Sequence, residues 1–166
     1  MKVSMTEEQY ITALKNNPNG VRNIPNPTEE MQLVCVKQNG MLLQYIKNPT
    51  DRVIETALAQ SPRAIQYVDN PSDELLISLV KQDWAVLEYI QHPSDDVVRI
   101  ALDQSGWAIR YITNPSEELQ LRAVETQYDA LQYIANPSER VQMAAVKSNY
   151  LSLRYIQNPT LDILKA

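Results

Sequence analysis

Proline recurs in this chain at a fixed interval of 22 residues, and this interval constrains the fold more than any other feature of the sequence. The series is Pro27, Pro49, Pro71, Pro93, Pro115, Pro137 and Pro159. Each of these prolines follows an Asn or a His and precedes a Ser or a Thr. A period of this length is typical of architectures in which short units stack on their neighbours to share an apolar core.

The start of each repeat predicts the start of a helix. Proline suits the first helical position and holds the residue before it in an extended conformation, so we expect the Asn before it to be the N-cap. The acid two residues later, as at Asp73, Glu117 and Glu139, then falls at the capping-box position. Acidic residues that complement the helix dipole gather in these first turns: Glu7, Glu8, Glu29, Glu30, Asp51, Asp73, Glu74, Asp95, Asp96, Glu117, Glu118 and Glu139. Lysines of the favourable sign recur near the opposite end: Lys15, Lys37, Lys81 and Lys147.

The body of this first helix carries one position that is nearly always small, which predicts close helix packing. That position reads Ala13, Cys35, Ala57, Leu79, Ala101, Ala123 and Ala145. Asn39-Gly40 and Ser105-Gly106 predict glycine C-caps at the end of the helix.

A second, shorter helix follows, as in residues 108–112. On a helical wheel Ala108, Ile109 and Ile112 share one face, with Tyr111 at its edge. The same pattern places tyrosine at residues 45, 67, 89, 111, 133 and 155, in a chain with nine Tyr and no Phe. We expect each ring to pack on the core while its hydroxyl reaches water or a polar partner. A structural spine and a ligand-stacking stripe both remain open for this tyrosine ladder.

These patterns predict an all-α, right-handed α-solenoid in a single repeat domain, 1–166. Short helices are marginal alone, and stacking supplies the burial that each lacks. The first repeat has Asn23 where Tyr is expected and extra prolines at Pro18 and Pro25, which indicates a terminal cap. The last fragment, with Ile163 and Leu164, either covers the final layer or favours homo-oligomerisation through the C-terminal end. The seven helix-turn-helix repeats span 6–26, 27–48, 49–70, 71–92, 93–114, 115–136 and 137–158, and a half repeat spans 159–166.

Two stretches carry a family resemblance. Pro-Ser-Glu-Glu-Leu-Gln-Leu-Arg-Ala-Val, residues 115–124, is similar to the second-helix consensus of HEAT-type repeats. The fuller pattern at 146–155 and 36–45 resembles short helical-repeat domains of uncharacterised phage, giant-virus, bacterial and protist proteins. The resemblance covers residues 6–160, implies a helical array, and makes a viral or bacterial origin plausible. It carries no general activity.

Composition narrows the environment of the protein. The formal net charge is -5, which disfavours non-specific attraction to nucleic acid or anionic membranes. The first residues lack the apolar run of a signal peptide, and no 18-residue apolar stretch occurs. With one cysteine, no intramolecular disulfide can form. We therefore expect a cytoplasmic protein, in the host cytoplasm if it is viral.

The sequence offers little chemistry for catalysis. The one histidine, His92, stands where the other repeats have Asn, so we expect a variant cap residue. Cys35 fills a small core position. Zinc sites want three or four His or Cys ligands, and the three glycines make no phosphate-binding loop. We expect a protein that is not an enzyme and that has no cofactor and no metal.

Recognition of another protein is the function that we expect. Side chains that vary between repeats are free for binding, and large apolar groups with arginines are typical of interfaces. Covering an adjacent layer is an equal alternative for these rings. Two further alternatives are an acidic decoy that mimics nucleic acid and the sequestration of a small ligand. Either could serve a virus as an inhibitor of a host factor. The candidate partner-binding residues lie at the turns and on the second helix: Trp84, Trp107, Tyr128, Tyr150, Met41, Leu151, Arg110 and Arg154.

Overall fold

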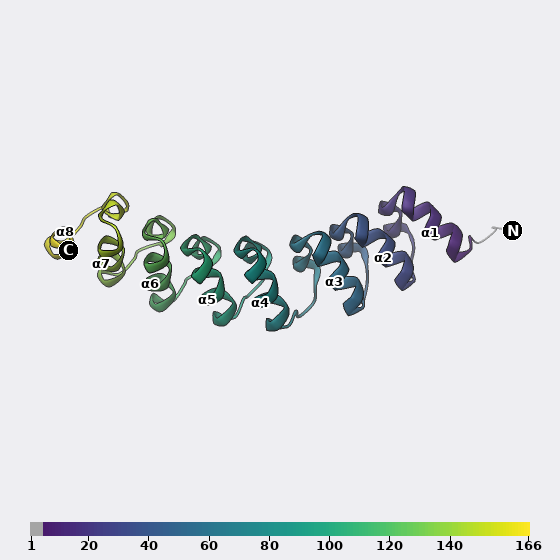
Figure 1. Cartoon of the computed structure of the whole chain (residues 1–166), viewed down its shortest axis with the longest axis horizontal. Helices are drawn as coiled ribbons and strands as arrows, with labels where there is room; N and C mark the ends of the chain where they lie inside the picture. The colour runs from purple at the N-terminus through teal and green to yellow at the C-terminus, as the bar shows by residue number, and fades with distance from the viewer. Residues whose placement is uncertain (1–4) are drawn as a thin grey trace. The chain divides into compact units, whose positions relative to one another are not determined.

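The computed structural model describes residues 5–166, and the chain divides into two compact units, Met1–Pro71 and Ser72–Ala166. In both units a ten-residue α-helix alternates with a six-residue 3-10 helix (Figure 1). No strand occurs among residues 5–166. This regular helical array confirms the fold class that the 22-residue period predicts.

The helices follow the repeat without interruption. Unit 1 holds α1 (Glu7–Asn16), η1 (Pro18–Asn23), α2 (Glu29–Gln38), η2 (Gly40–Tyr45), α3 (Asp51–Gln60) and η3 (Pro62–Tyr67). Unit 2 holds α4 (Asp73–Gln82), η4 (Trp84–Tyr89), α5 (Asp95–Gln104), η5 (Gly106–Tyr111), α6 (Glu117–Thr126), η6 (Tyr128–Tyr133), α7 (Glu139–Ser148), η7 (Tyr150–Tyr155) and α8 (Leu161–Lys165).

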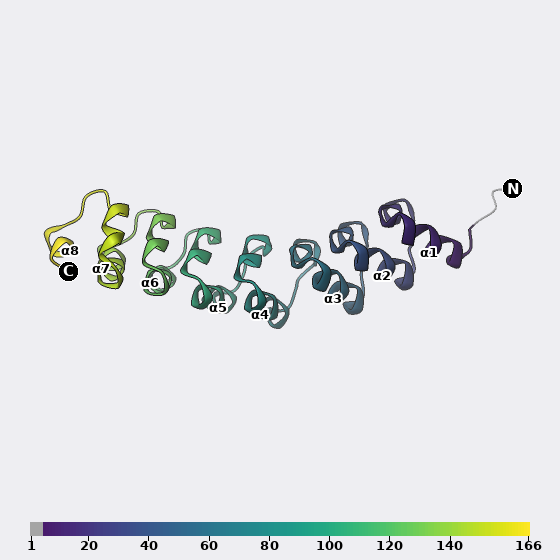
Figure 2. The same cartoon turned by 45° about the horizontal axis from the view of Figure 1, so that its top comes forward.

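Within each unit, consecutive repeats lie side by side. Helices α1 to α3 follow one another in unit 1, and α4 to α8 in unit 2, as two views show (Figures 1 and 2). Each 3-10 helix packs against its own α-helix, and η1, η2, η4, η5 and η6 also pack against the α-helix of the following repeat. The buried residues include the predicted small position, of which Cys35, Ala57, Ala101, Ala123 and Ala145 are 0% exposed. Shared burial between repeats therefore forms the core of each unit.

The N-cap of each helix from α2 to α8 is the Ser or Thr after the proline, so the predicted Asn N-cap is wrong. The Ser138 hydroxyl, for example, accepts the backbone N–H of Val141 at 3.3 Å. The acid after this Ser or Thr is consequently the first helical residue and not the capping-box residue. A complete capping box occurs at Thr6 and Gln9 in α1. The predicted acids in the first turns and lysines in the last turns are confirmed.

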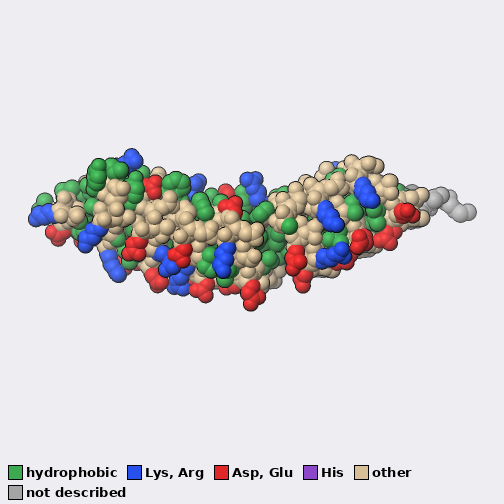
Figure 3. Space-filling view, viewed as in Figure 1, with side chains coloured by type: hydrophobic (Ala, Val, Ile, Leu, Met, Phe, Trp, Pro, Cys, Tyr) green, Lys and Arg blue, Asp and Glu red, His purple; other side chains and the backbone are tan. Residues whose placement is uncertain are grey.

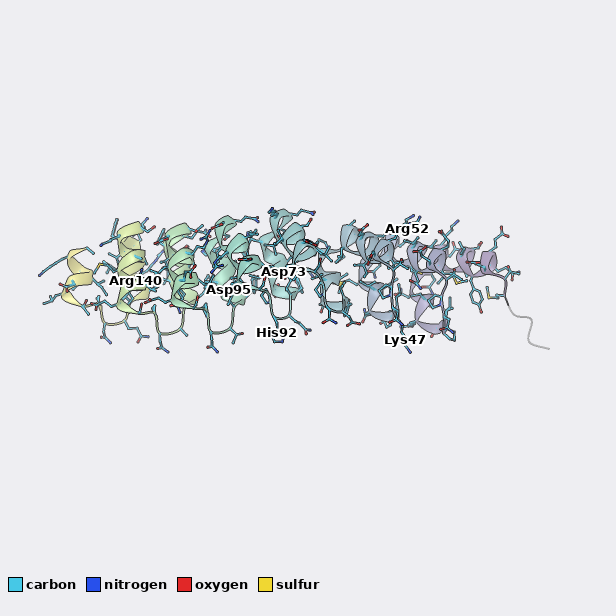
Figure 4. All side chains as sticks on the ribbon, turned by 90° about the horizontal axis from the view of Figure 1, so that it is seen from below. Lys47, Arg52, Asp73, His92, Asp95 and Arg140 are labelled. Carbon is cyan, nitrogen blue, oxygen red and sulfur yellow. The ribbon has the colours of Figure 1, made fainter. Side chains whose placement is uncertain are left out.

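The residue before the proline instead turns the chain between repeats. Asn48, Asn70, His92, Asn114 and Asn136 have backbone φ angles between 48° and 53°, in the left-handed region. Asn and His are among the non-glycine residues that enter this region most readily, which explains the choice of side chain. His92 is therefore a turn residue and not the predicted cap variant. Figure 4 shows it at the tip of a loop that projects from the helices.

A hydrogen bond between side chains links the starts of consecutive α-helices. The hydroxyl of the N-cap residue donates to the carboxylate of the first helical residue one repeat earlier. In this way the hydroxyl of such an N-cap residue accepts from its own helix and donates to the neighbouring one. The recorded pairs are Thr28 to Glu7 (2.6 Å), Thr50 to Glu29 (2.6 Å), Ser94 to Asp73 (2.8 Å), Ser138 to Glu117 (2.5 Å) and Thr160 to Glu139 (2.6 Å).

The predicted glycine C-caps of α2 and α5 are wrong, because the capping residues are Asn39 and Ser105 in extended conformation. No glycine of residues 5–166 has a positive φ. Gly106 instead begins η5, where an added Cβ would lie 2.2 Å from the backbone oxygen of Ala123 in the next repeat. Gly40 meets Ala57 in the same way. These glycines permit contact between backbones of adjacent repeats.

The second helix of each repeat is a 3-10 helix, so the helical wheel for 108–112 does not describe it. Ala108 and Ile109 are buried, as predicted. Ile112 is the C-cap residue in extended conformation, with φ of -102°, and is only half-buried. The backbone N–H of Ile112 donates to Ile109 O, three residues earlier, which is the tighter 3-10 pattern.

The ends of the array differ from its interior. In α1, Gln9 stands where every later helix except α4 buries an apolar residue, and Gln9 and Ala13 are exposed, as expected for a terminal cap. In α8, Ile163 is 1% exposed and the helix packs against α7, as expected of a covering segment. Leu161 and Leu164 remain exposed, and self-association through this end stays a prediction.

Candidate binding surface on the 3-10 helices

The 3-10 geometry determines which side chains face solvent. With three residues per turn, the second and fifth residues of each η helix lie on the same side. In unit 2 the third and fourth residues point into the core, apart from the half-buried Leu153. We call the opposite side of η4 to η7 the η face. Its residues are Ala85 and Glu88, Trp107 and Arg110, Asp129 and Gln132, and Leu151 and Arg154.

The η face contains four of the eight predicted binding residues: Trp107, Arg110, Leu151 and Arg154. Three others, Trp84, Tyr128 and Tyr150, begin their η helices beside this face. Tyr150 is 72% exposed, whereas Trp84 and Tyr128 are half-buried. Met41 has the position of Trp107 in η2, is half-buried, and belongs to unit 1.

Trp107 is held in place by the following repeat. Its indole Nε1 donates to Oδ1 of Asp129 at 2.8 Å. Its backbone N–H donates to Oε1 of Gln127 at 3.3 Å, an oxygen that also accepts the Ser105 hydroxyl at 2.6 Å. The ring is therefore oriented, although the residue is 36% exposed.

Arg110 lies between two rings of the tyrosine ladder. Its guanidinium carbon is 5.2 Å from the ring centroid of Tyr111 and 5.3 Å from that of Tyr133. Trp84 packs on Tyr111 from the preceding repeat, with centroids 6.3 Å apart. The guanidinium carbon of Arg154 lies 5.2 Å from the ring centroid of Tyr155. Trp84, Tyr111, Arg110 and Tyr133 thus form a row across three repeats, and Arg110 lies within the range at which a cation attracts a π face.

Sequence reasoning did not assign these tyrosines to the binding surface. Tyr133 is 37% exposed, and Tyr111 and Tyr155 are half-exposed, so the ladder lies at the edge of the core. The signal was present in the sequence, because a chain with nine tyrosines and no phenylalanine requires the hydroxyl. The fact that Arg110 reaches two rings depends on the separation of repeats, which the sequence alone does not give.

Arginines on the α-helices have a different environment, because they pair with acids. Arg122 holds Asp103 of the preceding repeat through two bonds, Nε to Oδ1 at 2.6 Å and Nη2 to Oδ2 at 2.7 Å. This contact lowers the pKa of Asp103. Arg99 pairs with Asp96 and Glu118. Arg52 and Arg140 lie 3.5 to 3.8 Å from acids of the preceding repeat (Figure 4). Figure 3 shows both signs of charge interspersed on the face that it displays.

Arg110 and Arg154, in contrast, form no ion pair with any side chain among residues 5–166. Their guanidinium groups are exposed and are oriented by aromatic rings instead. Two cations of the η face are therefore available to an outside partner.

A surface groove recurs beside the tyrosine ladder. In unit 2 one groove of about 640 Å³ is bounded by Ile90 and His92 of one repeat and by Pro93 and Tyr111 of the next. Equivalent grooves adjoin Tyr155 in unit 2 and Tyr45 and Tyr67 in unit 1. Their recurrence at equivalent positions shows that they follow from the repeat, and they are open to solvent.

The residues with reactive side chains are placed as follows. Cys35 is 0% exposed in the core of unit 1, where burial raises the pKa of its thiol to about 11. His92 lies on an exposed loop of unit 2. In the part of the chain that the structure describes, no group of three or more His, Cys, Asp or Glu residues could hold a metal ion. No helix within 5–166 combines the length and apolarity needed to cross a membrane.

Comparisons with family models, with curated proteins and with solved structures found no significant match to this chain.

Proposed function

We propose that this protein binds another protein through the η face of unit 2 and acts without catalysis. The observation that carries this proposal is the pair Trp107 and Arg110 on the η face: Asp129 orients the Trp107 indole, and the partly exposed rings of Tyr111 and Tyr133 orient Arg110. Trp84, beside this face, packs on Tyr111. Tryptophan, tyrosine and arginine are the residues enriched where truncation costs the most binding energy. Rings that are already oriented lose little conformational freedom when a partner covers them.

The acidic decoy receives less support from the positions of the acids. Glu29 and Glu117 each accept a hydroxyl and lie near an arginine. Acids neutralised in this way present less free negative charge than a row of phosphates, which on duplex DNA recurs about every 1.7 Å.

A selection experiment tests the proposal before any natural partner is identified. Phage that display a random peptide library are selected for binding to the immobilised protein. Soluble protein is then added as a competitor for the bound phage. The unmodified protein should displace the selected phage, whereas the Trp84→Ala/Trp107→Ala variant should not, because both rings of the surface are removed. Leu161→Ala is the matched control, since Leu161 is 71% exposed but lies on α8.

Folding of each variant is verified by circular dichroism. Trp84 is half-buried, so Trp107→Ala/Leu151→Ala, which removes two exposed η-face groups, serves as a second test should the first variant unfold. If both variants displace the phage as well as the unmodified protein does, this surface is not the binding site. A library from which no peptide is enriched would also contradict the proposal.

A further inference from the structure

We infer that the η face of unit 2 recognises an extended acidic segment that carries two carboxylates about six residues apart. This inference rests on the proposed function and specifies the chemistry of the partner. It begins with Arg110 and Arg154, which occupy the same position in repeats 44 residues apart and pair with no acid among the described residues. In a chain of net charge -5, these are cations that the protein leaves without an internal partner.

Stacking orients both guanidinium groups. Arg110 lies between Tyr111 and Tyr133, and Arg154 lies over Tyr155. A guanidinium that stacks on a ring keeps its N–H edge free, and that edge matches the two oxygens of a carboxylate. Carboxylates are therefore the groups that this arrangement favours.

The repeat sets the spacing between the two sites. Packed helical layers are about 8 to 10 Å apart, so two layers separate the arginines by roughly 16 to 20 Å. An extended peptide advances about 3.3 Å per residue, which corresponds to five or six residues. An apolar side chain accompanies each arginine one 3-10 turn earlier, Trp107 beside Arg110 and Leu151 beside Arg154. The partner segment should therefore present an apolar residue two positions from each acid, because alternate residues of an extended chain share one side.

The repeat between the two arginines defines where acids should be absent. Its η-face residues are Asp129 and Gln132, and the Asp129 carboxylate accepts the Trp107 indole. A third carboxylate in the middle of the segment would approach Asp129 and be repelled. This arrangement distinguishes two spaced acids from a continuous acidic run.

A synthetic peptide tests the inference directly. The probe has ten residues and a fluorescein label, with Leu at its first and seventh positions, Asp at its third and ninth, and glycine and serine elsewhere. Fluorescence anisotropy should show saturable binding to the full chain that weakens as salt rises, because the contacts are ionic and exposed. Replacement of both aspartates by asparagine, or a central third aspartate, should weaken binding.

Charge reversal identifies the arginines responsible. Arg110→Glu/Arg154→Glu should weaken binding by about tenfold or more, because each attraction becomes a repulsion. Arg140→Glu is the matched control: it reverses one charge in the same unit, but on α7, where Arg140 already faces Glu117. Arg110→Lys/Arg154→Lys should retain part of the affinity, because it keeps the charge and loses the flat stacking group.

The outcomes separate this inference from the proposed function. Absence of saturable binding, equal affinity of the asparagine peptide, or an unchanged affinity after Arg110→Glu/Arg154→Glu would each overturn the inference. Tighter binding of a single-stranded oligonucleotide of similar length would also overturn it. If the inference fails while Trp84→Ala/Trp107→Ala still abolishes competition in the phage selection, protein binding by the η face stands with a different partner chemistry.

Discussion

The hydroxyl of Thr50 donates a hydrogen bond to Oε1 of Glu29, 21 residues earlier in the chain, at 2.6 Å. The Thr50 hydroxyl oxygen also accepts the backbone N–H of Val53 and so caps helix α3. One side chain thus stabilises both the start of its own helix and the contact with the preceding repeat. The recurrence of this link explains why a hydroxyl residue and an acid follow nearly every proline of the series.

Replacement of this hydroxyl should have a larger effect than loss of an ordinary surface hydroxyl. Thr50→Val removes the cap and the inter-repeat bond, and should lower the free energy of unfolding by about 1 to 3 kcal/mol. Thr56→Val is the control, because the Thr56 hydroxyl bonds only to the Arg52 backbone oxygen within the same helix. Its effect should lie within about 0.5 kcal/mol. Urea unfolding followed by circular dichroism measures both, and equal losses would contradict the linking role.

The glycine that begins η5 should not tolerate a methyl group. A Cβ at residue 106 would lie 2.2 Å from the Ala123 oxygen, so Gly106→Ala must separate two repeats. We expect a loss of about 1 to 3 kcal/mol in the free energy of unfolding. Gly20→Ala is the matched control, since its Cβ would lie 3.4 Å from a Leu14 methyl carbon, in ordinary contact. That control should be neutral or stabilising by about 0.4 to 1 kcal/mol. Similar thermal unfolding midpoints for the two variants would refute the close-approach explanation.

A buried serine in η7 offers a stabilising substitution. Ser152 is 0% exposed, and its hydroxyl has no hydrogen-bond partner among residues 5–166. Ala108 and Ala130 occupy the same position in the two preceding repeats. Ser152→Ala should therefore raise the free energy of unfolding by about 1 kcal/mol, because a desolvated hydroxyl is removed. Ser148→Ala, at an exposed site, should change it by less than about 0.5 kcal/mol. A loss of stability in Ser152→Ala would indicate that the hydroxyl is satisfied.

Cys35 should make stability depend on alkaline pH. Burial raises the pKa of its thiol from 9.0 to about 11 in the folded protein. The neutral thiol is thus the form that the folded state prefers, and its contribution is complete below pH 9. Between about pH 9 and pH 11 the unfolded thiol ionises first, and about 2 to 3 kcal/mol should be lost.

The comparison with Cys35→Ala isolates this effect from other groups that titrate at high pH. The difference in free energy of unfolding between the two proteins should be constant below pH 9 and should shift against the unmodified protein above it. Alkylation by iodoacetamide at pH 8 should also be slow under native conditions and fast in urea, because the thiol is inaccessible. A pH-independent difference, together with rapid native alkylation, would show that the thiol is accessible.

The sequence predicts the α-helices and their period because those depend on local chemistry. Val141, Ala145 and Val146 lie on one side of a helix that starts near a proline, and all three are buried. The sequence does not locate the N-cap, because Asn136 and Ser138 are both of residue types that commonly cap helices. In the structure Ser138 accepts the backbone N–H of Val141, whereas Asn136 has a φ of 51° and turns the chain before the helix begins.

The arrangement of the candidate binding surface also depends on contacts between repeats. Trp107 and Arg110 could be identified as residues that depart from the repeat, and they share one side of η5. Their alignment depends on the 3-10 geometry, which places residues three apart together. The position of Arg110 between Tyr111 and Tyr133 depends on the distance between repeats, which no property of the individual residues specifies.

The link between each N-cap hydroxyl and the preceding acid has a consequence for how such a chain can change its length. If residues 115–136 were excised, Ser138 would follow the fifth repeat and would meet Asp95 in place of Glu117, a carboxylate again. Gly106 would then face Ala145 where it now faces Ala123, the same residue type. Loss or duplication of one full period therefore preserves the junction chemistry, whereas an insertion of any other size offsets donor from acceptor. Such a gene can grow or shrink in whole increments of 22 codons.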